Sequence, residues 1–303
     1  MPSYASARKV PYPQQRVVPI LGMHRSGTST FTRALNLMGL ELGEPLMTSQ
    51  SENPKGFWEN KFLWDVNVLL LHGVGRHVSG YGTLDQLLEI PGLSRRIERS
   101  EEILSTLSQY FRATYFGPTW GWKDPRSVLL FPFWMMVMTE LGYRHVSPMI
   151  ITRPPVASVS SLARRDDLNP LAKALGVGAR DLALQMWTAY SRILLDIAEE
   201  TDCYVGVNEW FFDAELARHE LARAAAYCGL SPDADQRVAA LDWIAPCSRH
   251  HRDTDADAGK DLFGEAEELY EALCSRARSQ RAIWLDASTI LPTTTPQVQL
   301  TPS

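Results

Sequence analysis

Val17-Val18-Pro19-Ile20-Leu21 and the following Gly22-Met23-His24-Arg25-Ser26-Gly27-Thr28-Ser29 decide the fold of this 303-residue chain. The first stretch is a short apolar run, typical of a buried strand, and it stops at a glycine. After the loop, apolar side chains recur at helical spacing from Phe31 to Met38, until another glycine ends the pattern. The sequence therefore predicts a strand, a glycine loop and a helix in succession.

The loop has the features of a site for a phosphate-type anion. Glycine permits positive φ angles and a close approach of the backbone, and the N–H groups at a helix N-terminus attract an anion. The loop matches G-x-x-x-x-G-K-[ST] except that Thr28 stands in place of the lysine. This departure argues against ordinary ATP or GTP hydrolysis, whereas Arg25 offers a cation from inside the loop. The alternative interpretation is a plain glycine turn with Arg25 as a surface charge.

Three further short runs, rich in aromatic or β-branched residues, are typical of strands. They lie at residues 120–123, 146–152 and 203–207. Proline and a helical stretch follow the first two runs, and the third leads into a helical pattern at residues 213–227. Parallel strands need crossover connections, which helices of this length provide. The sequence therefore predicts an α/β fold, with a P-loop-like parallel sheet and helices on both of its faces.

The chain from about residue 40 to residue 118 has no strand-like run and reads as a mainly helical insertion. Helical patterns cover residues 57–71 and 94–111. Because βα connections are usually far shorter, we expect the insertion to cover the active-site edge of the sheet. We predict a single domain over residues 16–285, a flexible segment at 1–15 and a disordered tail at 286–303, where Ser, Thr, Pro and Gln prevail.

Composition and charge exclude several classes of protein. With 30 Lys and Arg against 35 Asp and Glu, the net charge is −5, so no overall positive field attracts nucleic acid. The longest apolar run, residues 128–138, is far shorter than the roughly 20 residues of a membrane span. The first 15 residues contain no apolar segment like that of a signal peptide, so we expect a cytoplasmic protein.

Several separated motifs, taken in order, resemble one known family. They are Gly22-Met23-His24-Arg25-Ser26-Gly27-Thr28-Ser29, Asn53-Pro54-Lys55-Gly56-Phe57-Trp58-Glu59-Asn60, Lys123-Asp124-Pro125-Arg126, Arg153-Pro154 followed by Ser161, and Arg249-His250-His251-Arg252. Their order and placement resemble the sulfotransferases that take a sulfuryl group from 3′-phosphoadenosine 5′-phosphosulfate (PAPS). The resemblance is to bacterial members with a GMHRSGTS-type loop, and it spans about residues 17–252.

The resemblance implies a modified P-loop fold with PAPS as co-substrate and 3′-phosphoadenosine 5′-phosphate (PAP) as product. The residues that would surround the 5′-phosphosulfate are His24, Arg25, Ser26, Gly27, Thr28 and Ser29. Arg153 and Ser161 match the pair that holds the 3′-phosphate in the family. Arginine and serine suit a dianionic phosphate, and Arg153 ends a strand at the edge where open α/β sheets bind ligands. An arginine paired with a surface carboxylate and a backbone-bonded serine are the alternatives.

Two departures separate the chain from many cytosolic members of the family. Arg25 stands where those members carry lysine, and no Arg-Lys-Gly tripeptide, which they use on the nucleotide, occurs near the C-terminus. Arg249 and Arg252 are candidates to replace that tripeptide, with a basic surface loop as the alternative. The departures favour an acceptor hydroxyl on a carbohydrate, glycolipid or natural product over a small phenol.

Sulfuryl transfer is expected to be an in-line displacement that depends on positioned cations. Arg25 and Lys123 are the candidates, because Lys123 also ends a predicted strand at the carboxyl edge of the sheet. The alternative is a structural ion pair of Asp124, with Lys123 or with Arg126.

A base must also take the proton of the acceptor hydroxyl. Glu59 is the first candidate, because the adjacent Phe57 and Trp58 would raise its pKa by desolvation. A glutamate that complements a helix dipole is the alternative, and Glu52 and His72 are reserve candidates for the base.

No group of histidine, cysteine or carboxylate residues has metal-ligand spacing, so we expect no metal site. The leading prediction is a PAPS-dependent sulfotransferase with a small-molecule or glycan acceptor. A P-loop kinase or NTPase-like enzyme is the second possibility, and a catalytically silent nucleotide-binding protein is the third.

Overall fold

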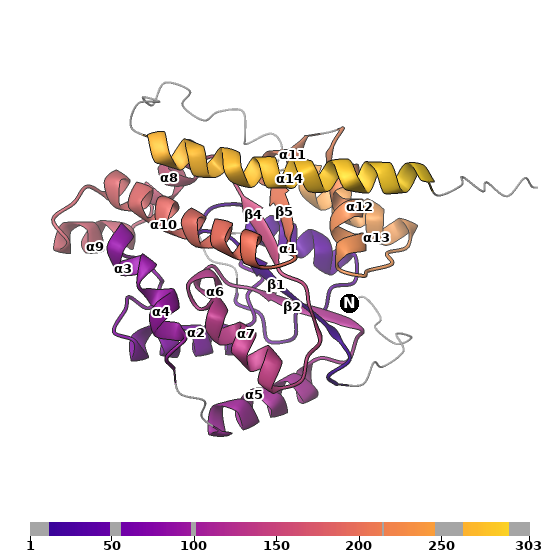
Figure 1. The fold of residues 1–303 in the computed structure, drawn as a ribbon, viewed down its shortest axis with the longest axis horizontal. Helices are drawn as coiled ribbons and strands as arrows, with labels where there is room; N and C mark the ends of the chain where they lie inside the picture. The colour runs from indigo at the N-terminus through magenta and orange to yellow at the C-terminus, as the bar shows by residue number, and fades with distance from the viewer. Residues whose placement is uncertain (1–11, 49–55, 98–100, 214, 246–262, 291–303) are drawn as a thin grey trace, which may run out of the picture.

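The computed structural model describes residues 12–48, 56–97, 101–213, 215–245 and 263–290, and a parallel sheet lies at its centre (Figure 1). The strands are β1 (Arg16–Leu21), β2 (Thr119–Lys123), β3 (His145–Val146), β4 (Met149–Thr152) and β5 (Tyr204–Val207). Their order is β2-β1-β4-β5, β3 also pairs with β1, and every pairing is parallel. The predicted α/β fold is confirmed.

Strand β1 owes its central position to an apolar side chain on both of its faces. Val18 and Ile20 belong to one buried cluster, whereas Val17 and Leu21 belong to the cluster on the opposite face. Successive side chains of a strand point to opposite faces, so an unbroken apolar run suits a strand covered from both sides. Burying both faces leaves only the ends of the strand for chemistry.

Helices cover the two faces of the sheet as two layers. The first layer packs on Val18 and Ile20 and consists of α1 (Thr28–Leu37), α12 (Ala217–Tyr227) and α13 (Ala234–Ile244). The second layer packs on Val17 and Leu21 and contains α6 (Arg126–Leu129), α7 (Phe131–Glu140), α8 (Pro155–Ala163), α10 (Ala179–Glu200) and α14 (Gly264–Ile290). The short helices α9 (Leu168–Ala174) and α11 (Asn208–Phe212) follow α8 and β5.

The described residues between α1 and β2 form four helices. They are α2 (Lys61–Gly73), α3 (Leu84–Leu88), α4 (Ile90–Ser94) and α5 (Glu101–Thr114). The predicted start of α2 at Phe57 is wrong, because Gly56 and Trp58 have φ angles of 89° and 58° and Asn60 caps the helix instead. The helix predicted at 94–111 begins at Glu101, where two glutamates complement the helix dipole.

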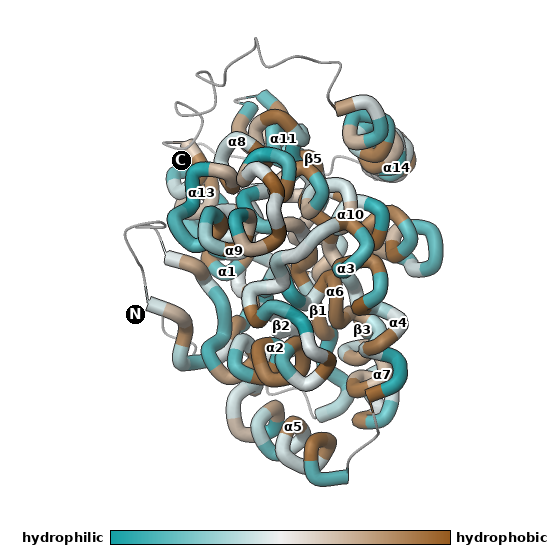
Figure 2. Tube along the Cα trace, turned by 90° about the vertical axis from the view of Figure 1, so that its left-hand side faces the viewer, coloured by the Kyte–Doolittle hydropathy of each residue, from teal (hydrophilic) through white to brown (hydrophobic). Residues whose placement is uncertain are grey.

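The described residues extend a few positions beyond each predicted end of the domain, and the rest of the predicted segments 1–15 and 286–303 lies outside the described residues. Tyr12 packs its ring under the Arg112 guanidinium at 4.0 Å, and Gln15 Nε2 donates to the carbonyl of Gly117 at 2.8 Å, so the packed chain begins before residue 16. At the other end α14 continues to Ile290, past the predicted start of the tail at 286. Helices α14 and α5 lie at opposite ends of the molecule, with the sheet between them (Figure 2). None of the described helices is long and apolar enough to cross a membrane.

Candidate active site at the carboxyl edge of the sheet

The loop at Gly22–Ser29 leaves β1 between the ends of β2 and β4 and has two residues in the left-handed region. Arg25 has a φ of 67° and Gly27 a φ of 85°. Gly22 brings the loop close to β4, because a Cβ on this residue would lie 2.7 Å from the carbonyl oxygen of Ile151. Side chains would therefore be excluded at Gly22 by contact and disfavoured at Gly27 by conformation.

Ser26 stabilises the loop from within. Its hydroxyl donates to the carbonyl of Met23 at 2.5 Å, and its backbone N–H approaches the same oxygen at 3.3 Å. The next two residues, Thr28 and Ser29, open α1. The first N–H groups of a helix have no partner within the helix, so the loop delivers unpaired donors to an anion at this point.

On the β4 side of the loop, two arginines and a serine form a cationic corner. Arg25 Nε donates to Ser161 Oγ of α8 at 2.9 Å, and Arg153 Nη1 donates to the carbonyl of Arg25 at 2.9 Å. These bonds hold the left-handed backbone of Arg25. Burial lowers the pKa of Arg153, the carboxylate of Glu209 opposes this, and the nearby charge of Arg25 lowers it further. Two guanidinium groups at such close quarters favour a bound anion.

On the β2 side of the loop, a buried lysine links the loop to a glutamate of the insertion. Lys123 Nζ lies 2.6 Å from Glu59 Oε1 and 3.2 Å from Ser29 Oγ, and both charged side chains are almost fully buried. Burial raises the pKa of Glu59, and the Lys123 charge acts in the opposite direction. The structure thus brings the candidate base, a candidate cation and the start of α1 together.

The two neighbours of Lys123 form a separate clamp. Asp124 Oδ1 accepts from Arg126 Nη1 at 2.8 Å and from the Arg126 backbone N–H at 2.9 Å, while Asp124 Oδ2 accepts from Asn67 Nδ2 at 2.9 Å. Of the two structural ion pairs that the alternative allows for Asp124, the one with Arg126 is present, whereas Lys123 pairs with Glu59. Within the described ranges, no three His, Cys, Asp or Glu side chains gather as a metal site would need.

His24 joins the loop to a segment of the insertion, residues 78–80, which we call the strap. The Nε2 atom of His24 donates to the carbonyl of Ser79 at 3.0 Å. Burial, followed by the charges of Arg126, Arg165 and Lys123, lowers the pKa of His24 well below its usual value. The imidazole is therefore neutral at pH 7. His24 connects two segments of the site, which agrees with a structural role for this residue.

The remaining predicted residues fall outside this cluster. Arg249, Arg252 and Glu52 lie outside the described residues. His72 lies in the last turn of α2, whereas Glu59 directly precedes the N-cap of the same helix. Thirteen helical residues span roughly 20 Å, so His72 is too distant to share the site with Glu59.

The tryptophans near the sheet edge have two kinds of surroundings. Trp120, Trp122 and Trp134 are fully buried in the cluster on the second face of the sheet. Trp58 lies directly before Glu59, and the Arg33 guanidinium covers its ring at 4.4 Å. A turn in the left-handed region and this cation–π contact together fix the entry of Glu59 into the site.

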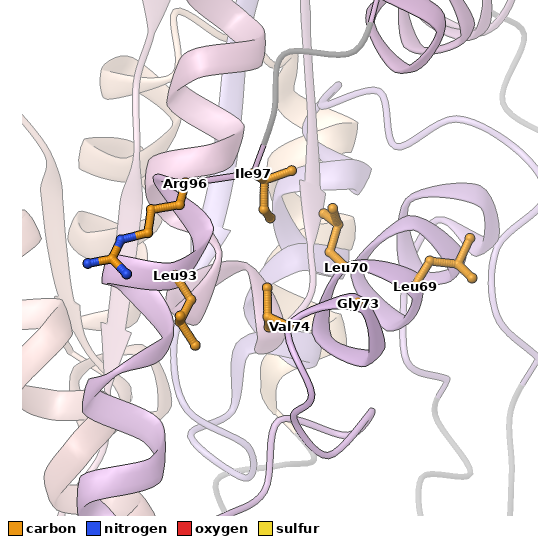
Figure 3. Close-up of a pocket in the computed structure, with 7 residues that line it drawn as sticks. All are labelled: Leu69, Leu70, Gly73, Val74, Leu93, Arg96 and Ile97. Carbon is orange, nitrogen blue, oxygen red and sulfur yellow. The ribbon is translucent and has the colours of Figure 1, made fainter.

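A pocket of about 470 Å³ opens elsewhere, between α2 and α4 (Figure 3). Its lining is apolar except for one arginine and consists of Leu69, Leu70, Gly73, Val74, Leu93, Arg96 and Ile97. The α2 residues of this pocket lie at the opposite end of the helix from Glu59, so the pocket is separate from the loop.

Sequence reasoning missed Asn208 and the strap. Asn208 directly follows β5, and its Nδ2 donates to the carbonyl of Ser26 at 3.0 Å. Its position after a strand run, like that of Lys123 and Arg153, was an available signal. The strap has no such signal, because its contacts are made by backbone carbonyls.

Comparison with known proteins bears on the fold. No protein-family model and no curated protein sequence matches the chain. Among solved structures, the sulfotransferase domain from the curacin biosynthetic pathway aligns with 86% of this chain and 98% of its own, with a TM-score of 0.50 and 12% identity. The chain has a sulfotransferase fold. The sulfotransferase domain from the Synechococcus PCC 7002 olefin synthase covers 89% of this chain and 98% of its own, with a TM-score of 0.46 and 13% identity.

Proposed function

We propose that this chain is a PAPS-dependent sulfotransferase that moves a sulfuryl group to an acceptor hydroxyl. The observation that carries the proposal is the division of charge around the loop. Arg25, Arg153 and Ser161 converge on the β4 side, whereas Lys123 and Glu59 meet beside Ser29 on the β2 side. A substrate with two separated anionic groups and a reacting centre suits such an arrangement.

The corner on the β4 side is suited to the 3′-phosphate. A guanidinium presents several donors in a fixed fork, and a serine hydroxyl adds one more. Arg25 already directs its side chain to Ser161, which lies in this corner. We therefore assign Arg25 to binding of the 3′-phosphate and leave Lys123 as the cation for the transferring group. This assignment differs from the sequence prediction, which placed Arg25 at the 5′-phosphosulfate and among the cations for the transfer.

The corner on the β2 side is suited to the chemistry. In the proposed reaction, the acceptor oxygen bonds to sulfur, the bond from sulfur to the 5′-phosphate oxygen breaks, and PAP leaves with that electron pair. Glu59 would take the proton of the acceptor hydroxyl. Lys123 and the N–H groups at the start of α1 would stabilise the charge that develops on the leaving phosphate.

The acceptor we propose is a hydroxyl on a carbohydrate, glycolipid or natural product. A kinase or NTPase is less well supported, because Thr28 replaces the P-loop lysine and Asp124 uses both of its oxygens in the clamp with Arg126 and Asn67. No observation favours a catalytically silent protein, since the candidate base and cation lie within hydrogen-bond distance of each other.

Turnover with PAPS tests the proposal. Purified protein is incubated with PAPS, EDTA and panels of sugar, glycolipid and natural-product acceptors, and mass spectrometry detects the added sulfuryl group. We expect transfer that survives the chelator, because the loop lacks the lysine and hydroxyl pair of Mg²⁺-dependent NTPases. Phosphoryl transfer from ATP that requires Mg²⁺ would replace this proposal with a kinase. Tight PAP binding without turnover on any acceptor would favour the silent protein.

A further inference from the structure

Two consecutive carbonyls of the loop are held by side chains from the ends of neighbouring strands. Arg153, after β4, binds the carbonyl of Arg25, and Asn208, after β5, binds the carbonyl of Ser26. Asn208 is 2% exposed, so its amide is ordered by its surroundings. The sheet edge therefore determines which way these two peptide units of the loop are turned.

Because of peptide geometry, the contact between Asn208 and the Ser26 carbonyl also sets the direction of the Gly27 N–H group. In a planar trans peptide, the C=O and the following N–H point in opposite directions. The Ser26 carbonyl faces Asn208, so the Gly27 N–H points to the opposite side, away from β5. Gly27 is the residue immediately before α1, where an anion would meet the helix N-terminus.

Gly27 and Asn208 fit each other closely. A Cβ on Gly27 would lie 1.9 Å from Asn208 Nδ2, far inside van der Waals contact, and the φ of 85° disfavours any other residue. Glycine at this position therefore serves the contact with Asn208 as well as the turn.

The side chain of Asn208 also lowers the stability of the fold. Its Oδ1 is buried and has no hydrogen-bond partner in the described part of the chain. A buried acceptor without a partner costs roughly 1–3 kcal/mol. The side chain is thus poorly explained by stability alone, and its Nδ2 contact with the loop offers another reason for its presence.

We propose that Asn208 is a positioning residue that turns the Ser26–Gly27 peptide so that the Gly27 N–H faces the phosphosulfate. This inference rests on the proposed function for the identity of the anion. It does not require Asn208 to touch the substrate. The contact would be lost with any side chain that cannot donate to the Ser26 carbonyl.

The test compares Asn208→Ala with the control Gln15→Ala. Gln15 is 1% exposed, its Nε2 donates to the carbonyls of Tyr115 and Gly117, and its Oε1 has no partner in the described part of the chain, so the control removes the same kind of bond just before β1 and β2, at the opposite edge of the sheet. Three quantities are measured in each variant: the Gly27 amide cross-peak in ¹⁵N-labelled protein without ligand, the affinity for PAP by calorimetry, and the melting temperature.

We expect Asn208→Ala to move the Gly27 cross-peak and to weaken PAP at least tenfold. Gln15→Ala should leave both within experimental error while lowering the melting temperature by a similar amount. An Asn208→Ala protein that binds PAP within twofold of the wild type would overturn the inference, whether or not the cross-peak moves.

A wild-type protein that does not bind PAP would refute the proposed function rather than this inference. Inorganic pyrophosphate is then the probe for the same loop. A tenfold loss of pyrophosphate affinity in Asn208→Ala, together with a moved Gly27 cross-peak, would support the positioning role. Unchanged affinity for pyrophosphate would reject it.

Discussion

Glu59 and Lys123 meet in a buried contact where two influences on the glutamate oppose each other. Burial favours the neutral carboxyl group and raises the pKa of Glu59, whereas Lys123 at 2.6 Å favours the carboxylate. Removing either partner would leave the other buried without its counter-charge, which is strongly unfavourable. The pair is therefore a sensitive place to test chemistry at the scale of single residues.

Glu59→Gln tests the base directly. Glutamine keeps the size of the side chain but cannot take a proton, so we expect the maximal rate to fall by roughly 10²–10⁴ with PAPS affinity preserved. The matched control is Glu41→Gln, because burial raises the pKa of Glu41 as well, but this half-buried side chain accepts from the backbone N–H groups of Phe116 and Gly117, just before β2. Near-normal turnover in Glu59→Gln would remove Glu59 from the mechanism.

We expect Lys123→Met to change how the reaction rate depends on pH. In the proposed mechanism Glu59 must be ionised to take a proton, so we expect the wild-type rate to fall as the pH drops through the pKa of Glu59. The Lys123 charge lowers that pKa, so its removal should raise the pKa and move the acid limb of the residual activity to higher pH. The measurement is the pH–rate profile of both proteins, and an acid limb that stays in place or moves to lower pH would contradict the pairing.

The strap shows how an element without regular structure can be held by its backbone. The carbonyls of Val78, Ser79 and Gly80 accept from Arg126 Nε, His24 Nε2 and the Tyr190 hydroxyl, at 2.8, 3.0 and 3.0 Å. These donors come from the start of α6, from the loop and from α10. One segment of the insertion thus joins three parts of the site.

Gly80→Ala tests this attachment, with Gly75→Ala as its control. Both glycines have a φ of 69°, but a Cβ at Gly80 would lie 2.6 Å from the Tyr190 hydroxyl, whereas Gly75 has open space around it. In both variants the left-handed backbone should lower the free energy of unfolding by roughly 1–2 kcal/mol, and the clash at Gly80 should lower it by about 1–3 kcal/mol more. Urea unfolding measures the difference in stability between the two variants. Equal losses would mean that the strap moves away from Tyr190 at little cost and is not held firmly.

At the scale of the whole molecule, α14 binds backbone groups at the edge strand of the sheet. Both polar atoms of the Gln280 amide bond to the backbone at β5, which is an edge strand. Oε1 accepts from the Val205 N–H at 2.9 Å, and Nε2 donates to the Cys203 carbonyl at 2.6 Å. An edge strand presents unpaired backbone groups, and a helix laid along it satisfies some of them. The final described helix is therefore part of the domain.

Much of this architecture follows from sequence, and the exceptions have physical reasons. The loop, the strand runs and the edge positions of Lys123 and Arg153 could be predicted, because apolar periodicity and glycine spacing are local signals. The start of α2 could not, because left-handed backbone at Trp58 goes against the usual preference of a bulky residue. Partner choice, such as Lys123 with Glu59, depends on contacts across 64 positions and is invisible to local pattern.

The measurement that tests the central claim most directly is a calorimetric titration of PAP and AMP in EDTA, with wild type and Arg153→Ala. These nucleotides differ only in the 3′-phosphate. We predict that the wild type binds PAP more tightly than AMP and that Arg153→Ala weakens PAP by about 1.5–3 kcal/mol. AMP should lose less, although not nothing, because Arg153 also holds the Arg25 carbonyl. Equal affinities of the wild type for PAP and AMP, or equal losses for both in the variant, would contradict the account.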